Sequence, residues 1–269
     1  MKTRPTVLSI AGYDPSGGAG LLADIKTFEA IKVYGLGVAT ALTWQNESEF
    51  VRVQWLPLQD ILSQIELLLR KSRVDYVKIG LLENAAVFGQ IIDFLLDKNP
   101  KVKIVWDPIL SASAGFDFHS TSLLSEWKEN LFKLYLFTPN WNELQWLAQS
   151  SDMTKAAEEL AALCHVFLKG GHRTDKVGYD ILAMRGSDIE VQRSAFKVQS
   201  SQAGLAKTYS FKPKNTTVWP KHGSGCVLSS AITAYLAKGY PLHKACLHAK
   251  TYVTQFLGSS EGLLGHHKF

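Results

Sequence analysis

Short apolar runs alternate with helical patterns along most of this chain, and this alternation constrains the fold more than any other feature. We predict buried strands at residues 6–11, 38–43, 74–79, 102–106, 134–137 and 164–169. Helical periodicity lies between them, at residues 20–32, 58–70, 85–96, 141–149 and 153–163. Strands that alternate with helices form right-handed crossovers and a mostly parallel sheet with helices on both faces. We therefore expect a three-layer α/β/α fold.

The pattern changes near residue 178 and predicts a short antiparallel edge of the sheet. Polar turns separate the strand-like runs that follow, at residues 179–184, 189–192 and 206–211. Two further helices are expected to close the chain, at residues 223–236 and 242–257. No linker or clear repeat divides the sequence, so we expect a single domain over residues 1–269.

The composition is that of a globular protein with a sizeable core. The chain has 269 residues, of which 46% are hydrophobic and 20% charged, and this excludes a disordered or collagen-like protein. No apolar run reaches the roughly 20 residues that span a bilayer, and the first residues lack the pattern of a secretory signal. Three widely separated cysteines fit a reducing compartment. We expect a cytoplasmic protein that does not bind membranes.

The charge balance is mildly basic, with 29 Lys and Arg against 24 Asp and Glu and a net charge of +5. A nucleic-acid interface needs basic residues gathered in runs or stripes, and the sequence contains none. The excess therefore indicates small anionic ligands or a solvated basic surface.

A glycine-rich segment runs from Gly12 to Gly20, directly after the first predicted strand. Ala19 follows Gly18, which excludes a P-loop because that motif ends in Gly-Lys-Ser/Thr. A dinucleotide fingerprint from Gly18 to Ala23 is present in form but lies too far beyond the strand. Two interpretations remain: a loop whose backbone approaches a small ligand, and a flexible turn before an ordinary helix.

A second cluster of small residues, Gly223, Ser224 and Gly225, precedes Cys226 and an apolar helix. Small residues at a helix start leave amides pointing outward, which creates an anion hole suited to a phosphoryl group in transfer. Cys226 falls in the first helical turn, where the helix dipole favours a thiolate that can act as a base. The alternative is that Cys226 is a small buried hydrophobic residue.

Together the two clusters resemble the signatures of bacterial hydroxymethylpyrimidine/phosphomethylpyrimidine kinases, which belong to the ribokinase-like superfamily. The first match covers residues 9–27, and the second covers residues 222–232, with Ser224 where Thr is usual. Further matches follow in the expected order, at residues 41–46, 77–82, 106–110, 138–143 and 168–172. The resemblance extends from residue 6 to about residue 258 and implies a ribokinase-like fold.

The resemblance implies an activity: ATP-dependent phosphorylation of 4-amino-5-hydroxymethyl-2-methylpyrimidine and then of its monophosphate, for thiamine synthesis. In that case Gln45 hydrogen-bonds the aminopyrimidine, because its amide offers both a donor and an acceptor. The resemblance places Gly12, Ala19, Asp24 and Leu81 in the pocket around the ring. Alone, Asp24 is explained as a residue of the first turn of a helix.

The resemblance also implies the phosphoryl-transfer residues. Gly223, Ser224 and Gly225 form the anion hole, and Cys226 is the base for the hydroxymethyl group. Asp107 and Glu143 organise Mg²⁺, while Asn140 and Lys169 face ATP. Asn140 and Glu143 also have the spacing of a helix capping box, and Lys169 is also explained as a solvated strand end. A K⁺ requirement stays open, and a homodimer is expected because the family is commonly dimeric.

Three other functions remain open from the sequence. Pyridoxal kinase is the nearest, since pyridoxal also carries a hydroxymethyl group on a nitrogen heterocycle. A binder of thiamine-pathway pyrimidines without catalysis comes next, and a dehydrogenase is the weakest. Two departures from the family pattern bear on the catalytic details: no Lys follows Asp107 closely, and residues 194–218 match poorly.

Overall fold

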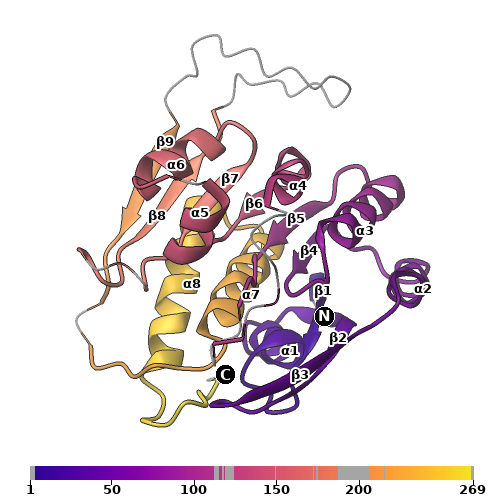
Figure 1. Cartoon of the computed structure of the whole chain (residues 1–269), viewed down its shortest axis with the longest axis horizontal. Helices are drawn as coiled ribbons and strands as arrows, with labels where there is room; N and C mark the ends of the chain where they lie inside the picture. The colour runs from indigo at the N-terminus through magenta and orange to yellow at the C-terminus, as the bar shows by residue number, and fades with distance from the viewer. Residues whose placement is uncertain are drawn as a thin grey trace.

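A single extended sheet forms the centre of the computed structural model, which describes residues 4–111, 115–116, 118, 124–148, 150–171, 173, 175–186, 206–214 and 216–267. Within these ranges the strand order is β3-β2-β1-β4-β5-β6-β7-β8-β9 (Figure 1). The strands are β1 (Thr6–Tyr13), β2 (Tyr34–Gln45), β3 (Phe50–Trp55), β4 (Tyr76–Ile79), β5 (Lys103–Trp106), β6 (Leu136–Phe137), β7 (His165–Leu168), β8 (Asp180–Met184) and β9 (Lys207–Phe211).

The sheet is mostly parallel, as predicted. The six central strands, in the order β2-β1-β4-β5-β6-β7, pair in parallel. Strands β8 and β9 add the expected antiparallel edge. A second antiparallel edge was not predicted: β3 pairs with β2, with Trp44 opposite Arg52. The residues of β3 are exposed or only half-buried, so the strand needs no continuous apolar run and its sequence shows none. The strand predicted at 189–192 lies outside the described residues.

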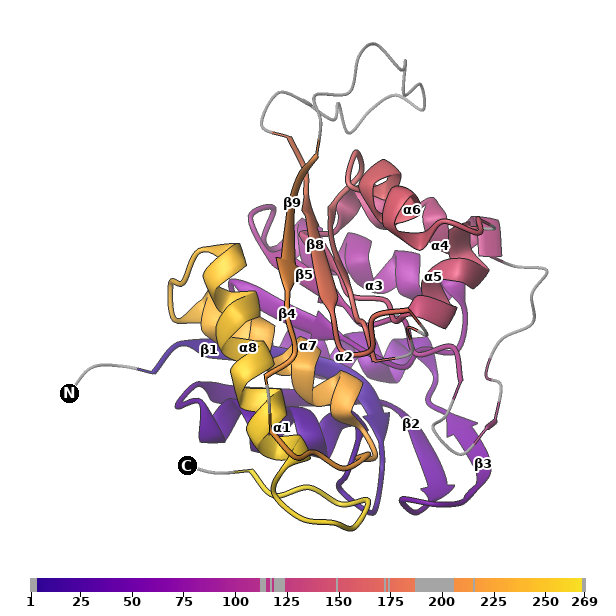
Figure 2. The same ribbon diagram turned by 90° about the vertical axis from the view of Figure 1, so that its left-hand side faces the viewer.

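Helices cover both faces, which confirms the three-layer architecture. On one face lie α1 (Gly20–Ala30), α7 (Ser224–Ala237) and α8 (Leu242–Leu257). The other face carries α2 (Leu58–Leu69), α3 (Ala85–Lys98), α4 (Leu124–Lys128), α5 (Trp141–Ala148) and α6 (Met153–Leu160). Figure 2 shows α1, α7 and α8 on one side of the sheet and α4, α5 and α6 on the other. None of the helices in the described ranges has the length and apolar character needed to cross a membrane.

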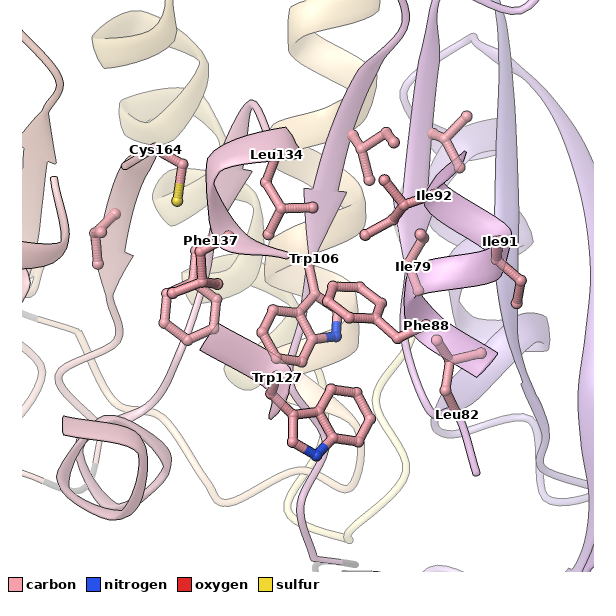
Figure 3. Close-up of a cluster of buried hydrophobic side chains, with 14 of the residues drawn as sticks. Ile79, Leu82, Phe88, Ile91, Ile92, Trp106, Trp127, Leu134, Phe137 and Cys164 are labelled. Carbon is pink, nitrogen blue, oxygen red and sulfur yellow. The ribbon is translucent and has the colours of Figure 1, made fainter. Parts of the chain in front are cut away.

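An aromatic cluster fixes the end of β5 (Figure 3). The Trp106 ring centroid lies 5.4 Å from that of Trp127, 4.4 Å from Phe88 and 5.0 Å from Phe137. Trp106 is 1% exposed, so its large apolar surface is removed from water. The packing of this side chain also positions the next residue, Asp107, at the carboxyl end of the strand.

A buried ion pair joins four elements on the opposite face. Lys78 of β4 donates to the Asp24 carboxylate of α1 at 2.8 and 3.0 Å, and both side chains are 0% exposed. The hydroxyls of Ser9 in β1 and Ser230 in α7 each donate to the same carboxylate at 2.6 Å. Burial works to lower the pKa of Lys78, but the charge of Asp24 outweighs it and raises that pKa above its ordinary value.

Lys78→Met tests the importance of this pair. The substitution leaves a buried carboxylate without its counter-charge, which should cost about 3–5 kcal/mol of unfolding free energy in urea denaturation. The double variant Lys78→Met/Asp24→Asn removes both charges and should regain much of that loss. Lys133→Met is the control: its partner Asp93 is 63% exposed, so the loss should stay below about 1 kcal/mol. Equal losses of unfolding free energy for Lys78→Met and Lys133→Met would contradict a special contribution of the buried Lys78–Asp24 pair to stability.

Candidate active site

The residues singled out by the sequence gather at one edge of the sheet. Strands β1, β4, β5, β6 and β7 run parallel, so the segments that follow them emerge at the same edge, where ligands bind in open α/β sheets. Leu81, Asp107, Asn140 and Lys169 lie in these segments, and Gly12 lies at the carboxyl end of β1 itself. Helix α7 brings its first turn, with Ser224, Gly225 and Cys226, to the same region, since a Cβ atom at Gly225 would lie 3.4 Å from Lys169 Nζ.

The two glycine-rich segments are in direct backbone contact. A Cβ atom at Gly223 would lie 2.1 Å from the carbonyl oxygen of Gly18 and 2.6 Å from Ala19 Cα, and Gly223 has a φ of +71°. Only glycine satisfies both the left-handed conformation and this close approach. As a result the first turns of α1 and α7 converge.

Cys226 lies where these helix termini meet. The backbone amide of Gly20, the first residue of α1, lies near the Cys226 sulfur and acts to lower the pKa of the thiol. The side chain is 5% exposed, and this burial raises the pKa of the thiol to about 12, although the charge of Lys78 opposes the rise. A helix terminus stabilises a charge by at most about 2 kcal/mol, whereas burying an unpaired charge costs more. Of the two interpretations left open by the sequence, the burial of Cys226 agrees with a small buried residue, and the raised pKa of the thiol disfavours a resting thiolate. Its position in the first turn of α7 is as predicted.

Lys169 lies between two carboxylates. Its Nζ is 2.6 Å from Asp107 Oδ1 and 3.5 Å from Glu143 Oε2. Ser229 donates to the other Asp107 oxygen at 3.0 Å, a contact that the sequence analysis missed. The spacing of Ser229, one helical turn after Gly225, was the available signal.

Burial and mutual charge set the ionisation of this cluster. Burial works to raise the pKa of Asp107, but Lys169 and then Lys78 lower it below its ordinary value. Burial raises the pKa of Glu143 to about 7, with Asp107 adding to the rise and Lys169 opposing it. Burial tends to lower the pKa of Lys169, but the two carboxylates raise it above its ordinary value. The ammonium of Lys169 is therefore a firmly held positive charge beside α7.

Asn140 and Glu143 form the capping box that their spacing suggested. The Asn140 amide donates to Glu143 Oε2 at 2.6 Å, and the Glu143 amide donates to Asn140 Oδ1 at 2.9 Å. The carboxylates of Asp107 and Glu143 lie close together, since both are within 3.5 Å of the Lys169 ammonium. Carboxylate oxygens are the donors that Mg²⁺ prefers. The donor set thus fits a magnesium ion that also binds phosphates. Within the described ranges, no three or more His, Cys, Asp or Glu side chains form a cluster that could hold a metal alone.

Gln45 lies at the end of β2, connected by hydrogen bonds to the first glycine-rich segment. It donates to Thr43 Oγ1 at 2.9 Å, and Thr43 donates to the Tyr13 carbonyl at 2.8 Å. A Cβ atom at Gly12 would lie 3.0 Å from Leu81 Cδ2, so these two predicted pocket residues are neighbours. The structure thereby brings Gln45, Gly12 and Leu81 to the same edge.

Asp24 occupies a different environment from the one implied by the resemblance. Its carboxylate is fully buried and accepts hydrogen bonds from Lys78, Ser9 and Ser230. A direct contact with a ligand would need an exposed oxygen, so the expected pocket contact is corrected to an interior ion pair. Lys78 falls within the matched range 77–82, but its pairing with Asp24 was not predicted.

The three cysteines are all free and buried. Cys164 and Cys246 are each at most 1% exposed and pack in the two hydrophobic cores on opposite faces of the sheet. Their burial in these cores is typical of structural cysteines, and of the three only Cys226 lies at the converging helix termini.

Comparisons with known proteins identify the family. A family model described as phosphomethylpyrimidine kinase matches residues 14–212 and 203–268. The thiamine biosynthesis bifunctional protein ThiED of Geobacter sulfurreducens is 36% identical over 98% of this chain, which spans only 52% of that protein. The hydroxymethylpyrimidine/phosphomethylpyrimidine kinase of Haemophilus influenzae is 31% identical, with 92% of this chain and 89% of that protein covered.

Solved structures of kinases share the fold. A phosphomethylpyrimidine kinase from Clostridium difficile 630 superposes with a TM-score of 0.71 at 33% identity, covering 93% of this chain and 98% of that one. The pyridoxal kinase of Staphylococcus aureus in complex with ADP gives a TM-score of 0.77 at 25% identity, covering 96% and 89%. The ribokinase-like fold is confirmed, and the chain belongs to the phosphomethylpyrimidine kinase family.

Proposed function

We propose that this protein phosphorylates the hydroxymethyl group of 4-amino-5-hydroxymethyl-2-methylpyrimidine with ATP, and then phosphorylates the monophosphate. The observation that carries the proposal is the close approach of Lys169 to Gly225 in the first turn of α7, with Asp107 and Cys226 beside them. An anion hole, a cation and carboxylates that can hold a metal thus lie around one point. Residues from 12 to 226 contribute to it, which supports a single functional domain over the whole chain.

In the proposed mechanism the protein acts mainly by positioning and by charge. Lys169 and the amides of residues 223–225 face the γ-phosphoryl group, while Gln45 holds the aminopyrimidine through its amide. Asp107 and Glu143 would hold Mg²⁺, which neutralises charge on the phosphates when it is bound. Cys226 faces the acceptor hydroxyl and takes its proton. A thiol with a pKa of about 12 is mostly protonated at neutral pH, so only a small ionised fraction is active as the base.

Pyridoxal kinase activity is the second candidate. It is supported by the similarity to the Staphylococcus aureus pyridoxal kinase, whose TM-score of 0.77 exceeds the 0.71 of the phosphomethylpyrimidine kinase. The higher identity to the latter, 33% against 25%, favours the pyrimidine. Both substrates carry a hydroxymethyl group on a six-membered nitrogen heterocycle, so one site can bind either.

A single ATP-coupled assay separates these candidates. ADP release is measured with hydroxymethylpyrimidine, with its monophosphate and with pyridoxal, and the highest kcat/KM is expected for the pyrimidine alcohol. A reaction without an acceptor alcohol is the control for ATP hydrolysis. A kcat/KM that is higher for pyridoxal would favour the second candidate. Thermal stabilisation by the pyrimidine without any ADP release would contradict both kinase proposals and indicate a binding protein.

Cys226→Ala tests the base. Loss of a proton-transfer group lowers kcat by about 10²–10⁴-fold, and pyrimidine binding measured by calorimetry should persist. The base is active when ionised, and its pKa is raised, so wild-type kcat/KM should rise between pH 7 and pH 10. Cys226→Ala should lack this rise.

A matched control is Cys246→Ala, which removes an equally buried thiol from α8 and should keep the wild-type kcat and pH profile. A Cys226→Ala enzyme with near-normal turnover would rule out Cys226 as the base. Cys226→Ser with wild-type turnover would do the same, because a serine hydroxyl ionises even less readily than a thiol.

A further inference from the structure

One buried pair connects the two glycine-rich segments and has no role in the mechanism above. The Nε2 atom of His222 lies 2.9 Å from Asp14 Oδ2, and the two side chains are 5% and 1% exposed. Asp14 belongs to the first segment and His222 directly precedes Gly223 in the second. The pair therefore spans the contact on which the convergence of α1 and α7 depends.

Asp14 organises the first segment around its carboxylate. It accepts hydrogen bonds from the backbone amides of Ser16 and Ala19 at 2.9 and 2.8 Å, and from the Ser16 hydroxyl at 2.9 Å. Burial works to raise the pKa of Asp14, but the hydrogen bond with His222 and those with Ser16 and Ala19 outweigh it and lower that pKa. Asp14 is thus ionised, and the hydrogen shared with His222 is carried by Nε2.

The orientation of the His222 ring depends on this single hydrogen bond. Its other nitrogen, Nδ1, is buried and has no hydrogen-bond partner in the described part of the chain. The ring packs closely on the first segment, because a Cβ atom at Gly18 would lie 2.7 Å from His222 Cδ2. The backbone of His222 is fixed separately, since its amide donates to the Leu263 carbonyl at 2.9 Å.

We propose that Asp14 and His222 are positioning residues for phosphoryl transfer: their hydrogen bond sets the register of the two glycine-rich segments, and so the alignment of the α7 amides and Cys226 with the first segment. The proposal rests on the proposed kinase function. Transition-state stabilisation depends on placement to within a fraction of an ångström, and a 1 Å displacement can lower a rate by about 10²-fold. A loosened contact should therefore reduce kcat much more than it changes substrate binding.

The test compares two substitutions of His222. His222→Leu keeps the volume but removes the donor, so kcat should fall about 10–100-fold while KM for ATP and for the pyrimidine change less than about 3-fold. His222→Gln presents an amide N–H near the position of Nε2 and should restore kcat to within about 3-fold of wild type. The double variant Asp14→Ala/His222→Leu should be no slower than Asp14→Ala alone, because both remove the same contact.

Controls separate positioning from general destabilisation. Leu95→Ala in α3 removes buried side-chain volume far from either segment, and it should lower the unfolding midpoint without changing kcat. His222→Leu with wild-type kcat, a loss confined to KM, losses that add in the double variant, or a Gln variant as slow as the Leu variant would each overturn the positioning role. A wild-type enzyme without turnover of pyrimidine or pyridoxal would instead overturn the proposed function itself.

Discussion

The arrangement of the active site depends on one buried carboxylate. Asp24 of α1 accepts hydrogen bonds from β1, β4 and α7, through Ser9, Lys78 and Ser230. A charge removed from water is tolerated only when its hydrogen-bonding capacity is satisfied, so these elements have little freedom to shift. Because α1 and α7 are tied to the same carboxylate, their first turns are brought together, and Cys226 lies at that junction.

The burial that restricts the movement of these elements also determines which side chains of the site are charged. In a site of low polarity each charge acts strongly, so under the proposed function the Lys169 ammonium beside Asp107 is suited to a phosphate partner. The same burial disfavours a thiolate at Cys226. A kinase can function with a mostly protonated base, because phosphoryl transfer requires little covalent chemistry from the protein. Positioning and electrostatics supply most of the rate enhancement.

Local patterns in the sequence predicted what local physics determines. Helix α8 has the predicted bounds, and the capping box at Asn140 and Glu143 forms as its spacing indicates, because both depend on nearby residues alone. Strand β3 was missed because an edge strand is stabilised by pairing and needs no apolar run. The environment of Asp24 could not be inferred, since its partner Lys78 is 54 positions away and the pairing exists only in the folded chain. The sequence left the ionisation of Cys226 open for the same reason: burial is a property of the tertiary structure.

The glycines of the two segments have a further meaning in the folded protein. From the sequence, the first cluster was either a loop that approaches a ligand or a flexible turn, and the second indicated amides that point outward from a helix start. In the structure, the space that a Cβ atom would need at Gly223 is filled by Gly18 and Ala19, and at Gly20 it is filled by the Gly12 carbonyl. The small residues therefore first allow one backbone segment to lie against another at the start of α7. The two motifs, although separated by some two hundred residues, thus impose one joint structural requirement.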